Sequence, residues 1–187
     1  MEYVDPIKDL ESIHKMKEIL GQQSQRDLLF FVFGINTGIK INELLSLKVK
    51  DVRGEKGLKQ FLHLKDSHTN EIKSFYLNHK IRHELEKYFS EQPLDDDDYL
   101  FKSKKNSLPI TRQQAYRIIN QAAKKAGVSG KIGTHTLRKT FGYHAYKKGI
   151  AISIIREIFN HHSRSETLRY IGIDPEDKEP IKVDVNL

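Results

Sequence analysis

Apolar residues recur at helical spacing near the start of the chain. In residues 9–21 the apolar positions are Leu10, Ile13, Met16, Ile19 and Leu20. This spacing predicts an amphipathic helix. A second helix is expected from Arg26 to Asn36, with Ser24 as its cap. Its run LLFFVFGI is apolar on nearly all sides, which predicts a helix buried at the centre of the molecule.

The same helical pattern returns further along the chain. After a break at Thr37-Gly38, a short helix is expected over 42–47. Longer helices are predicted over residues 80–89, 112–125, 134–148, 151–160 and 165–171. Thr111 is a cap for one of them, and Gly127 and Gly149 mark two of the ends.

Alternating apolar positions predict two strands, Leu58–Leu64 and Ile72–Leu77, joined by a polar turn. Phe61, Phe75 and Leu77 are the candidate inward-facing residues. Residues 180–187 also alternate, so they are expected to form an added strand or a mobile arm. The fold class predicted is mainly α with a small antiparallel β-sheet (α+β). A doubly wound nucleotide-binding fold is disfavoured, because strands do not alternate with helices along the chain.

Length and composition fit one soluble domain: the chain has 187 residues and no cysteine, which excludes disulfides and thiolate metal sites. The start of the chain has no secretory signal pattern, so a cytoplasmic location is expected. A formal net charge of +7 favours a polyanionic partner such as nucleic acid. The acidic run Asp95–Asp98 is expected to be a solvated loop facing away from DNA.

The segment GTHTLRKTF, residues 133–141, offers candidate chemistry. His135 and Arg138 are three residues apart, hence neighbours on one helical face, where a cation and an imidazole together could anchor a phosphate. Taken alone, the segment fits a structural ion pair of Arg138 and a hydrogen-bonded His135 at least as well.

Further segments, in the same order, resemble the tyrosine recombinases, or phage-type integrases. The matching segments are Thr37–Leu47 (TGIKINELLSL), Phe61–Lys65 (FLHLK), Tyr99–Ser103 (YLFKS), His135–Arg138 (HTLR), and Phe159–His161 with Tyr170 nine residues later. Each motif is weak by itself, but five in the correct order are specific. The resemblance covers roughly residues 25–173 and implies the tyrosine recombinase catalytic-domain fold.

The resemblance implies a nucleophilic role for Tyr170, which would attack a DNA phosphodiester and form a 3′-phosphotyrosine. Arg138 and His161 would bind the phosphate, and His135 would assist proton transfer or hold the phosphate. Lys65 would protonate the leaving 5′-oxygen. No metal and no cofactor are implied.

Two positions leave alternatives open, and a third departs from the family pattern. His162 competes with His161, and Lys73 competes with Lys65, although the spacing favours the two named first. Lys40 falls where the family has its first arginine; lysine keeps the charge but loses the bidentate geometry, so reduced activity is expected. Glu43 is interpreted as a structural partner of Lys40 or of a neighbouring residue.

The resemblance also implies an organisation and a set of partners. Residues 1–173 would be the catalytic domain, with 1–24 as a helical lead-in and 174–187 as a tail that could dock in trans. An N-terminal core-binding domain is expected to be absent. The partner is double-stranded DNA, bound by a homotetramer on paired sites in the full-length protein, while the isolated domain could be a monomer. The expected setting is the bacterial nucleoid and the integration or excision of a mobile element or prophage.

Basic side chains outside the motifs are candidate contacts to the DNA backbone. They are Lys102, Lys104, Lys105, Arg112, Arg117, Lys139 and Arg164. Two other functions stay open at this point. One is DNA relaxation in the manner of a type IB topoisomerase, and the other is a DNA-binding module that has lost catalysis, for which Lys40 is the only support.

Overall fold

The computed structural model describes residues 3–66 and 69–177, and the tail expected at 180–187 lies outside this range. The helices in chain order are α1 (Leu10–Gln23), α2 (Gln25–Thr37), α3 (Ile41–Leu45), α4 (Val49–Val52), α5 (His79–Glu91), α6 (Arg112–Lys125), α7 (Thr136–Lys147), α8 (Ile152–Phe159) and α9 (Arg164–Tyr170). The strands are β1 (Arg53–Gly54), β2 (Gly57–Leu58), β3 (Phe61–Lys65) and β4 (Ile72–Tyr76). No described helix is long and apolar enough to cross a membrane.

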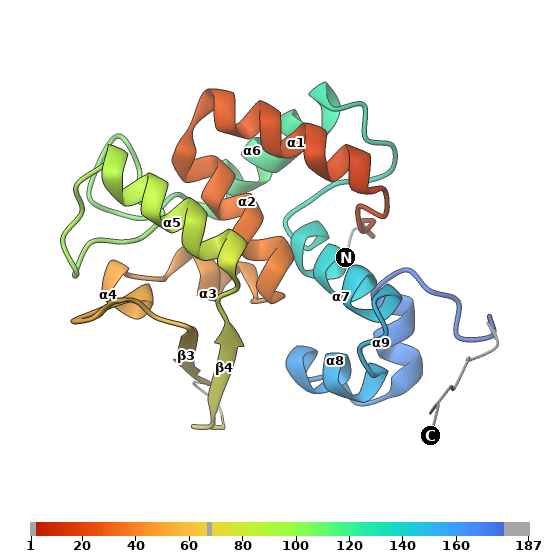
Figure 1. The fold of residues 1–187 in the computed structure, drawn as a ribbon. Coiled ribbons are helices and arrows are strands. Elements are labelled where there is room, and N and C mark those ends of the chain that lie inside the picture. The colour runs from red at the N-terminus through yellow and green to blue at the C-terminus, as the bar shows by residue number, and fades with distance from the viewer. Residues whose placement is uncertain (1–2, 67–68, 178–187) are drawn as a thin grey trace, which may run out of the picture.

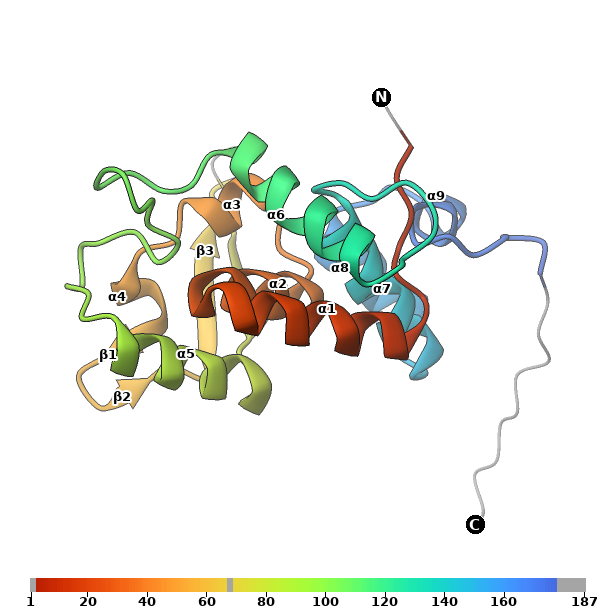
Figure 2. The same cartoon turned by 90° about the horizontal axis from the view of Figure 1, so that it is seen from above.

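Helix α2 is the buried centre of the molecule, as its apolar sequence predicts. Every side chain from Leu28 to Phe33 is buried, and helices α1, α5 and α7 pack around it. The Ser24 hydroxyl caps its first turn by accepting from the Asp27 amide, and Gly38 ends it in a left-handed conformation with φ of 67°. Figures 1 and 2 show α7 between α2 and the α8–α9 pair.

The predicted hairpin is present, but one of its faces was assigned wrongly. Strands β3 and β4 are antiparallel, with Phe61 opposite Tyr76 and Leu62 opposite Phe75. Directly opposed residues point to the same face. Leu62 and Phe75 are therefore the buried pair, whereas Phe61 is 45% exposed. Leu77, just after the strand, is buried as predicted.

The segment before the hairpin differs from the sequence prediction. The single expected sheet is two separate two-stranded sheets, because Leu58 pairs with Arg53 in the β1–β2 turn rather than extending β3. Helix α4 just before β1 was not predicted either, since four residues are too few to show a helical period.

A second, smaller apolar cluster carries the C-terminal helices. Ile155 and Phe159 of α8 pack with Leu168 of α9 and with Ile171, apart from the main core. Gly142 of α7 lets these helices approach, because a Cβ there would lie 2.5 Å from Ile171 Cγ2 and 2.8 Å from a ring carbon of Phe159. The position of α9, and of the tyrosine at its end, therefore depends on close packing against α7.

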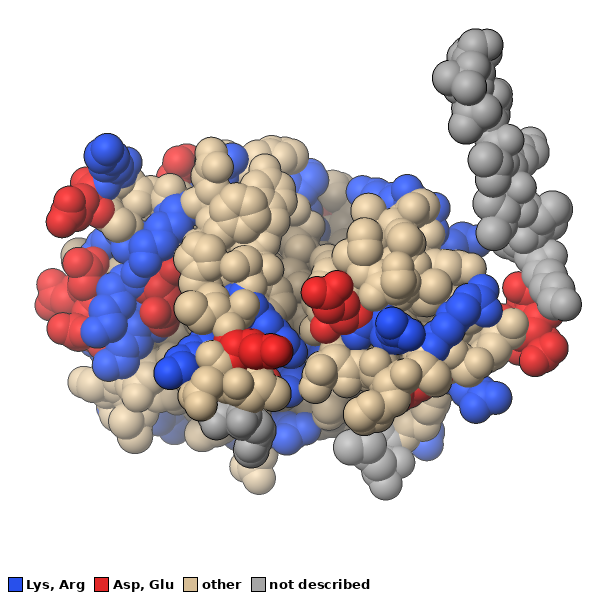
Figure 3. Space-filling model, turned by 90° about the horizontal axis from the view of Figure 1, so that it is seen from below, with Lys and Arg blue, Asp and Glu red and all other residues tan. Residues whose placement is uncertain are grey.

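The acidic run forms a loop, as expected, but its side chains are largely paired. Asp96 binds Arg53, Asp97 binds Lys50 and Asp98 binds Lys102, each at 2.7 Å. Figure 3 shows acidic and basic side chains intermixed along one edge of the molecule. The run therefore offsets nearby basic residues and does not form a separate acidic patch.

Candidate active site

A cavity of about 560 Å³ brings most of the predicted site residues together. It lies where the N-terminal segment, α3, α7 and the α8–α9 unit meet. Its lining residues are Tyr3, Val4, Lys40, Ile41, Asn42, Glu43, Arg112, Thr134, His135, Arg138, Lys139, Phe159, His161 and Tyr170. Five of the six catalytic candidates are in this set, and the sixth, Lys65, is not.

Arg138 is buried at the cavity wall, with 8% of its surface exposed. Its guanidinium donates to the Gly38 carbonyl oxygen at 2.7 Å and to the Phe159 carbonyl oxygen at 2.9 Å. It also lies 4.4 Å from the centroid of the Phe159 ring. These contacts hold the cation rigidly between the end of α2 and the end of α8. The two carbonyls use two of its five N–H groups, and the guanidinium also interacts with the Tyr170 hydroxyl, so the remaining N–H groups are directed toward the nucleophile and a ligand beside it.

Tyr170, at the end of α9, is half-buried at the cavity wall. Its ring makes edge contacts with His161 (centroids 4.9 Å apart) and with Phe159 (5.3 Å). Burial raises the pKa of the Tyr170 hydroxyl, and the nearby Arg138 charge opposes that shift. The tyrosine is therefore protonated at neutral pH and needs a proton acceptor before it can act as a nucleophile.

His161 follows a turn in which Asn160 caps α8 with a left-handed φ of 56°. Its Nδ1 lies 3.1 Å from the Thr167 hydroxyl, which itself donates to the Ser163 carbonyl oxygen. Thr167 therefore occupies Nδ1 and leaves Nε2 as the nitrogen available to the cavity. Burial lowers the pKa of His161. The competing His162 is exposed and does not line the cavity.

His135 immediately precedes α7 and is half-buried beside the cavity. Its Nε2 lies 3.2 Å from a terminal nitrogen of Arg112, which is the donor because a guanidinium has no acceptor. Burial, followed by the charges of Arg112, Lys139 and Arg138, lowers the pKa of His135. The imidazole is therefore neutral at pH 7.

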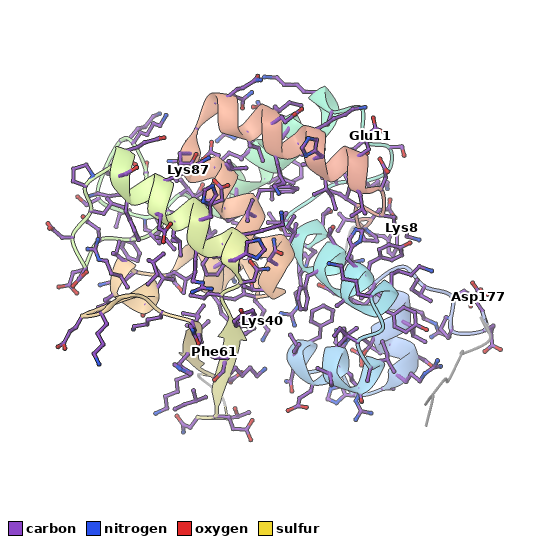
Figure 4. The ribbon with its side chains drawn as sticks, in the orientation of Figure 1. Lys8, Glu11, Lys40, Phe61, Lys87 and Asp177 are labelled. Carbon is purple, nitrogen blue, oxygen red and sulfur yellow. The ribbon has the colours of Figure 1, made fainter. Side chains whose placement is uncertain are left out.

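Lys40 is exposed, lines the cavity and immediately precedes α3. Figure 4 places it between the hairpin and helices α7 and α8. Its backbone N–H donates to Glu43 Oε2 at 3.3 Å, so Glu43 has the structural role expected, through the backbone of Lys40 and not through its ammonium. The Lys40 ammonium forms no ion pair within the described ranges, which leaves it open to an anion in the cavity.

Lys65 is not brought to the cavity in this structure. It ends β3 on the exposed face of the hairpin, opposite Ile72. The competing Lys73 points to the other face, is half-buried and lies 4.0 Å from Asp66 Oδ2. For Lys65 to act at the same phosphate, the hairpin must therefore move toward the cavity, or the bound DNA must extend toward Lys65.

The sequence did not indicate that the N-terminal segment and Lys139 belong to this site. Lys139 was expected to be a surface contact to DNA, but it is 6% exposed. Its ammonium donates to the Val4 carbonyl oxygen at 2.8 Å and lies 4.3 Å from the Tyr3 ring and 5.0 Å from the Tyr170 ring. Helix α7 is covered by the N-terminal segment on this side. No signal in the sequence joins residues that are 135 positions apart.

The arrangement suits a phosphate. A rigid guanidinium, an exposed ammonium and two neutral imidazoles surround a cavity that also contains a tyrosine hydroxyl. Cations can stabilise the charge of a phosphoryl group, an imidazole can exchange a proton, and the tyrosine can be a nucleophile. In the described part of the chain, no group of three or more His, Cys, Asp or Glu side chains could hold a metal ion.

The sequence and the fold match a known class of DNA-processing enzyme. The profile of the Phage integrase family matches residues 7–177. The probable integrase/recombinase YoeC of Bacillus subtilis is 41% identical over 174 residues, which cover 93% of this chain and 92% of that protein. The tyrosine recombinase XerA of Pyrococcus furiosus is 30% identical over 87% of this chain and 56% of its own length. The chain therefore belongs to the phage integrase family, the tyrosine recombinases, which break and rejoin DNA.

Solved structures agree on the fold. A crystal structure of XerA recombinase superposes with a TM-score of 0.75 and 22% identity, covering 93% of this chain and 61% of that one. A lambda integrase dimer bound to a core site has a TM-score of 0.69 and 16% identity, covering 99% of this chain and 65% of that one. The predicted fold is thus confirmed. The chain spans a little over half of XerA but nearly all of YoeC.

Proposed function

We propose that this chain is the catalytic domain of a site-specific DNA recombinase with Tyr170 as its nucleophile. The Tyr170 Oη attacks the phosphorus of one DNA phosphodiester, and the bond from phosphorus to the 5′-oxygen breaks. The products are a 3′-phosphotyrosine and a free 5′-hydroxyl. The tyrosine's proton passes to a base, and the leaving 5′-oxygen takes a proton from an acid. A phosphotyrosine conserves the ester, so a second 5′-hydroxyl can displace Tyr170 without an energy source.

The observation that supports this proposal most directly is the common cavity of Tyr170, Arg138, His135 and His161. Arg138 would bind the nonbridging oxygens with the N–H groups that its backbone carbonyl partners leave available. Neutral His135 would accept the proton of Tyr170. His161 would donate to the phosphate from Nε2–H in its protonated form, because its Nδ1–H already donates to the Thr167 hydroxyl. Each preorganised contact to the developing charge can contribute roughly 10²- to 10³-fold in rate.

Lys40 and Lys65 complete the proposed machinery. Lys40 would neutralise one phosphate oxygen as a point charge, because an ammonium lacks the fork of a guanidinium. Lys65 would be the general acid for the 5′-oxygen once DNA is bound, since it is exposed and has no ion pair among the described residues.

The wider biology belongs to the same proposal. The substrate is double-stranded DNA, and the reaction integrates or excises a mobile element or prophage at the nucleoid of a bacterial cytoplasm. Strand exchange would take place in a homotetramer on paired sites, with residues 174–187 docking in trans. The likeness to recombinases whose structures contain DNA supports the DNA substrate.

The experiment is to trap the covalent intermediate. A nicked duplex loses the short fragment that ends in the free 5′-hydroxyl after cleavage, so the adduct accumulates. Wild-type protein is incubated with a library of nicked fragments from the genome that encodes this chain. A denaturation-resistant adduct that is absent in Tyr170→Phe supports the proposal. No adduct under these conditions would favour a DNA-binding module without catalysis.

A further inference from the structure

We infer that Arg112 is a catalytic residue that supplies a second guanidinium for the scissile phosphate, next to the position occupied by Lys40. This inference rests on the proposed function and adds to it a residue outside the motifs that identify the family. Arg112 is the first residue of α6, and it lines the same cavity as Tyr170, Arg138 and Lys40.

The contacts of Arg112 leave its guanidinium available. The side chain is exposed, and within residues 3–66 and 69–177 its one hydrogen-bond partner is His135 Nε2, at 3.2 Å. It forms no salt bridge with any acidic side chain there, unlike Arg53, which is paired with Asp96. A guanidinium beside a neutral imidazole is a charge without a counterion, and it stands within hydrogen-bond distance of a proposed catalytic group.

The other cations at the cavity leave a role for this one. Arg138 donates two N–H groups to the carbonyl oxygens of Gly38 and Phe159, and these hydrogen bonds fix the plane of its guanidinium. Lys40 has one rotatable ammonium on a flexible stem and is unable to form a bidentate contact. A phosphodiester in the transition state has two nonbridging oxygens, each with several acceptor positions. One constrained guanidinium and one ammonium leave acceptor positions that a planar fork from Arg112 can fill.

The contact with His135 gives Arg112 a second effect. In the structure Arg112 donates to His135 Nε2, so that nitrogen is occupied while no phosphate is bound. A phosphate oxygen is a stronger acceptor for a guanidinium than a neutral imidazole is. Phosphate binding would therefore draw Arg112 away from His135 and release Nε2 to take a proton.

The test is single-turnover cleavage of the nicked DNA at saturating protein, together with DNA affinity. Arg112→Ala should lower the cleavage rate by about 10²-fold, and Arg112→Lys by about tenfold, because charge without the fork is only part of the function. The acid limb of the pH–rate profile should move to higher pH in Arg112→Ala, since the Arg112 charge helps to lower the pKa of His135. Lys125→Ala removes one charge from the exposed far end of the same helix, roughly 20 Å away at ~1.5 Å per residue, and is the matched control.

A double-mutant cycle tests whether Arg112 and Lys40 act on the same phosphate. Lys40→Arg should raise the cleavage rate, and in that background Arg112→Ala should cost about tenfold or less, because a second fork is now present. Equal losses in both backgrounds would contradict the inference. So would a weaker DNA affinity with an unchanged saturated rate, which is the signature of a simple backbone contact.

A readout without catalysis separates this inference from the proposed function. Inorganic phosphate is titrated into the Tyr170→Phe protein while the His135 ring is followed by NMR. Arg112→Ala should weaken phosphate binding about tenfold, and Lys125→Ala should not. Phosphate binding that depends on Arg112, together with no adduct in the wild-type protein, would contradict only the recombinase reaction. Adduct formation that ignores Arg112 would contradict only the inference.

Discussion

Gly142→Ala tests whether close packing against α7 positions the nucleophile. The new Cβ would lie 2.5 Å from Ile171 Cγ2 and 2.8 Å from two ring carbons of Phe159. An alanine in a helix is favoured over glycine by about 1 kcal/mol. Overpacking of this kind costs roughly 1–3 kcal/mol. The free energy of unfolding should therefore fall by roughly 0–2 kcal/mol, which leaves the protein folded.

The effect on cleavage should be larger than the effect on stability. Ile171 follows Tyr170 directly, and Phe159 contacts the rings of both Tyr170 and His161. A shift of about 1 Å at a reacting group can cost about 10²-fold in rate. We therefore expect the single-turnover rate of adduct formation to fall by about 10²-fold, while urea denaturation shows only the small loss of stability.

Gly21→Ala is the matched control for this experiment. Its Cβ would be 3.3 Å from Leu28 Cδ2, the flexible end of a side chain in the main core. The same chemical change should leave cleavage unaltered and should stabilise α1 by up to about 1 kcal/mol. If Gly142→Ala cleaves DNA as fast as the wild type, the packing of α8 and α9 on α7 does not set the position of Tyr170.

Two further predictions follow from the histidines. Thr167→Val removes the hydroxyl beside His161 Nδ1. Because the imidazole of His161 is then no longer held in place, adduct formation should slow roughly tenfold, or about 1.4 kcal/mol. An unchanged rate and pH profile would refute a positioning role for Thr167. His135 and His161 both have pKa values below their ordinary 6.5, so below that pH the unfolded chain binds more protons than the folded one. Stability should then fall as the pH drops from about 7.5 to about 5.5. Replacing both histidines with glutamine should flatten that slope in urea denaturation, and an equal slope would contradict the assignment.

The local parts of this structure could be predicted from the sequence. Helix α2 is capped by Ser24, ends at Gly38 and is buried along its apolar run. These features could be predicted because each signal acts over a few neighbouring residues. The His135/Arg138 pair and the interval from His161 to Tyr170 were equally readable, since their relations are local in sequence. The hairpin and its buried Phe75 and Leu77 were predicted. The exposure of Phe61 was not, because its pairing with Tyr76 is decided across the turn.

The parts that were missed depend on contacts between distant segments. Lys139 is next to Arg138, and only the N-terminal segment that covers α7 determines that it is buried. Arg112 reaches His135 from another helix, 23 positions earlier in the chain. Helical periodicity reports which face of a helix is apolar, but it does not report what stands opposite a polar residue.

Mass spectrometry of the trapped adduct shows whether Tyr170 itself forms the covalent bond to DNA. Wild-type protein that has reacted with the nicked DNA is denatured, digested with protease and nuclease, and its peptides are sequenced. We expect a nucleotide phosphate on Tyr170 and no adduct in Tyr170→Phe. An adduct that maps to another residue, or one that persists in Tyr170→Phe, would show that Tyr170 is not the nucleophile.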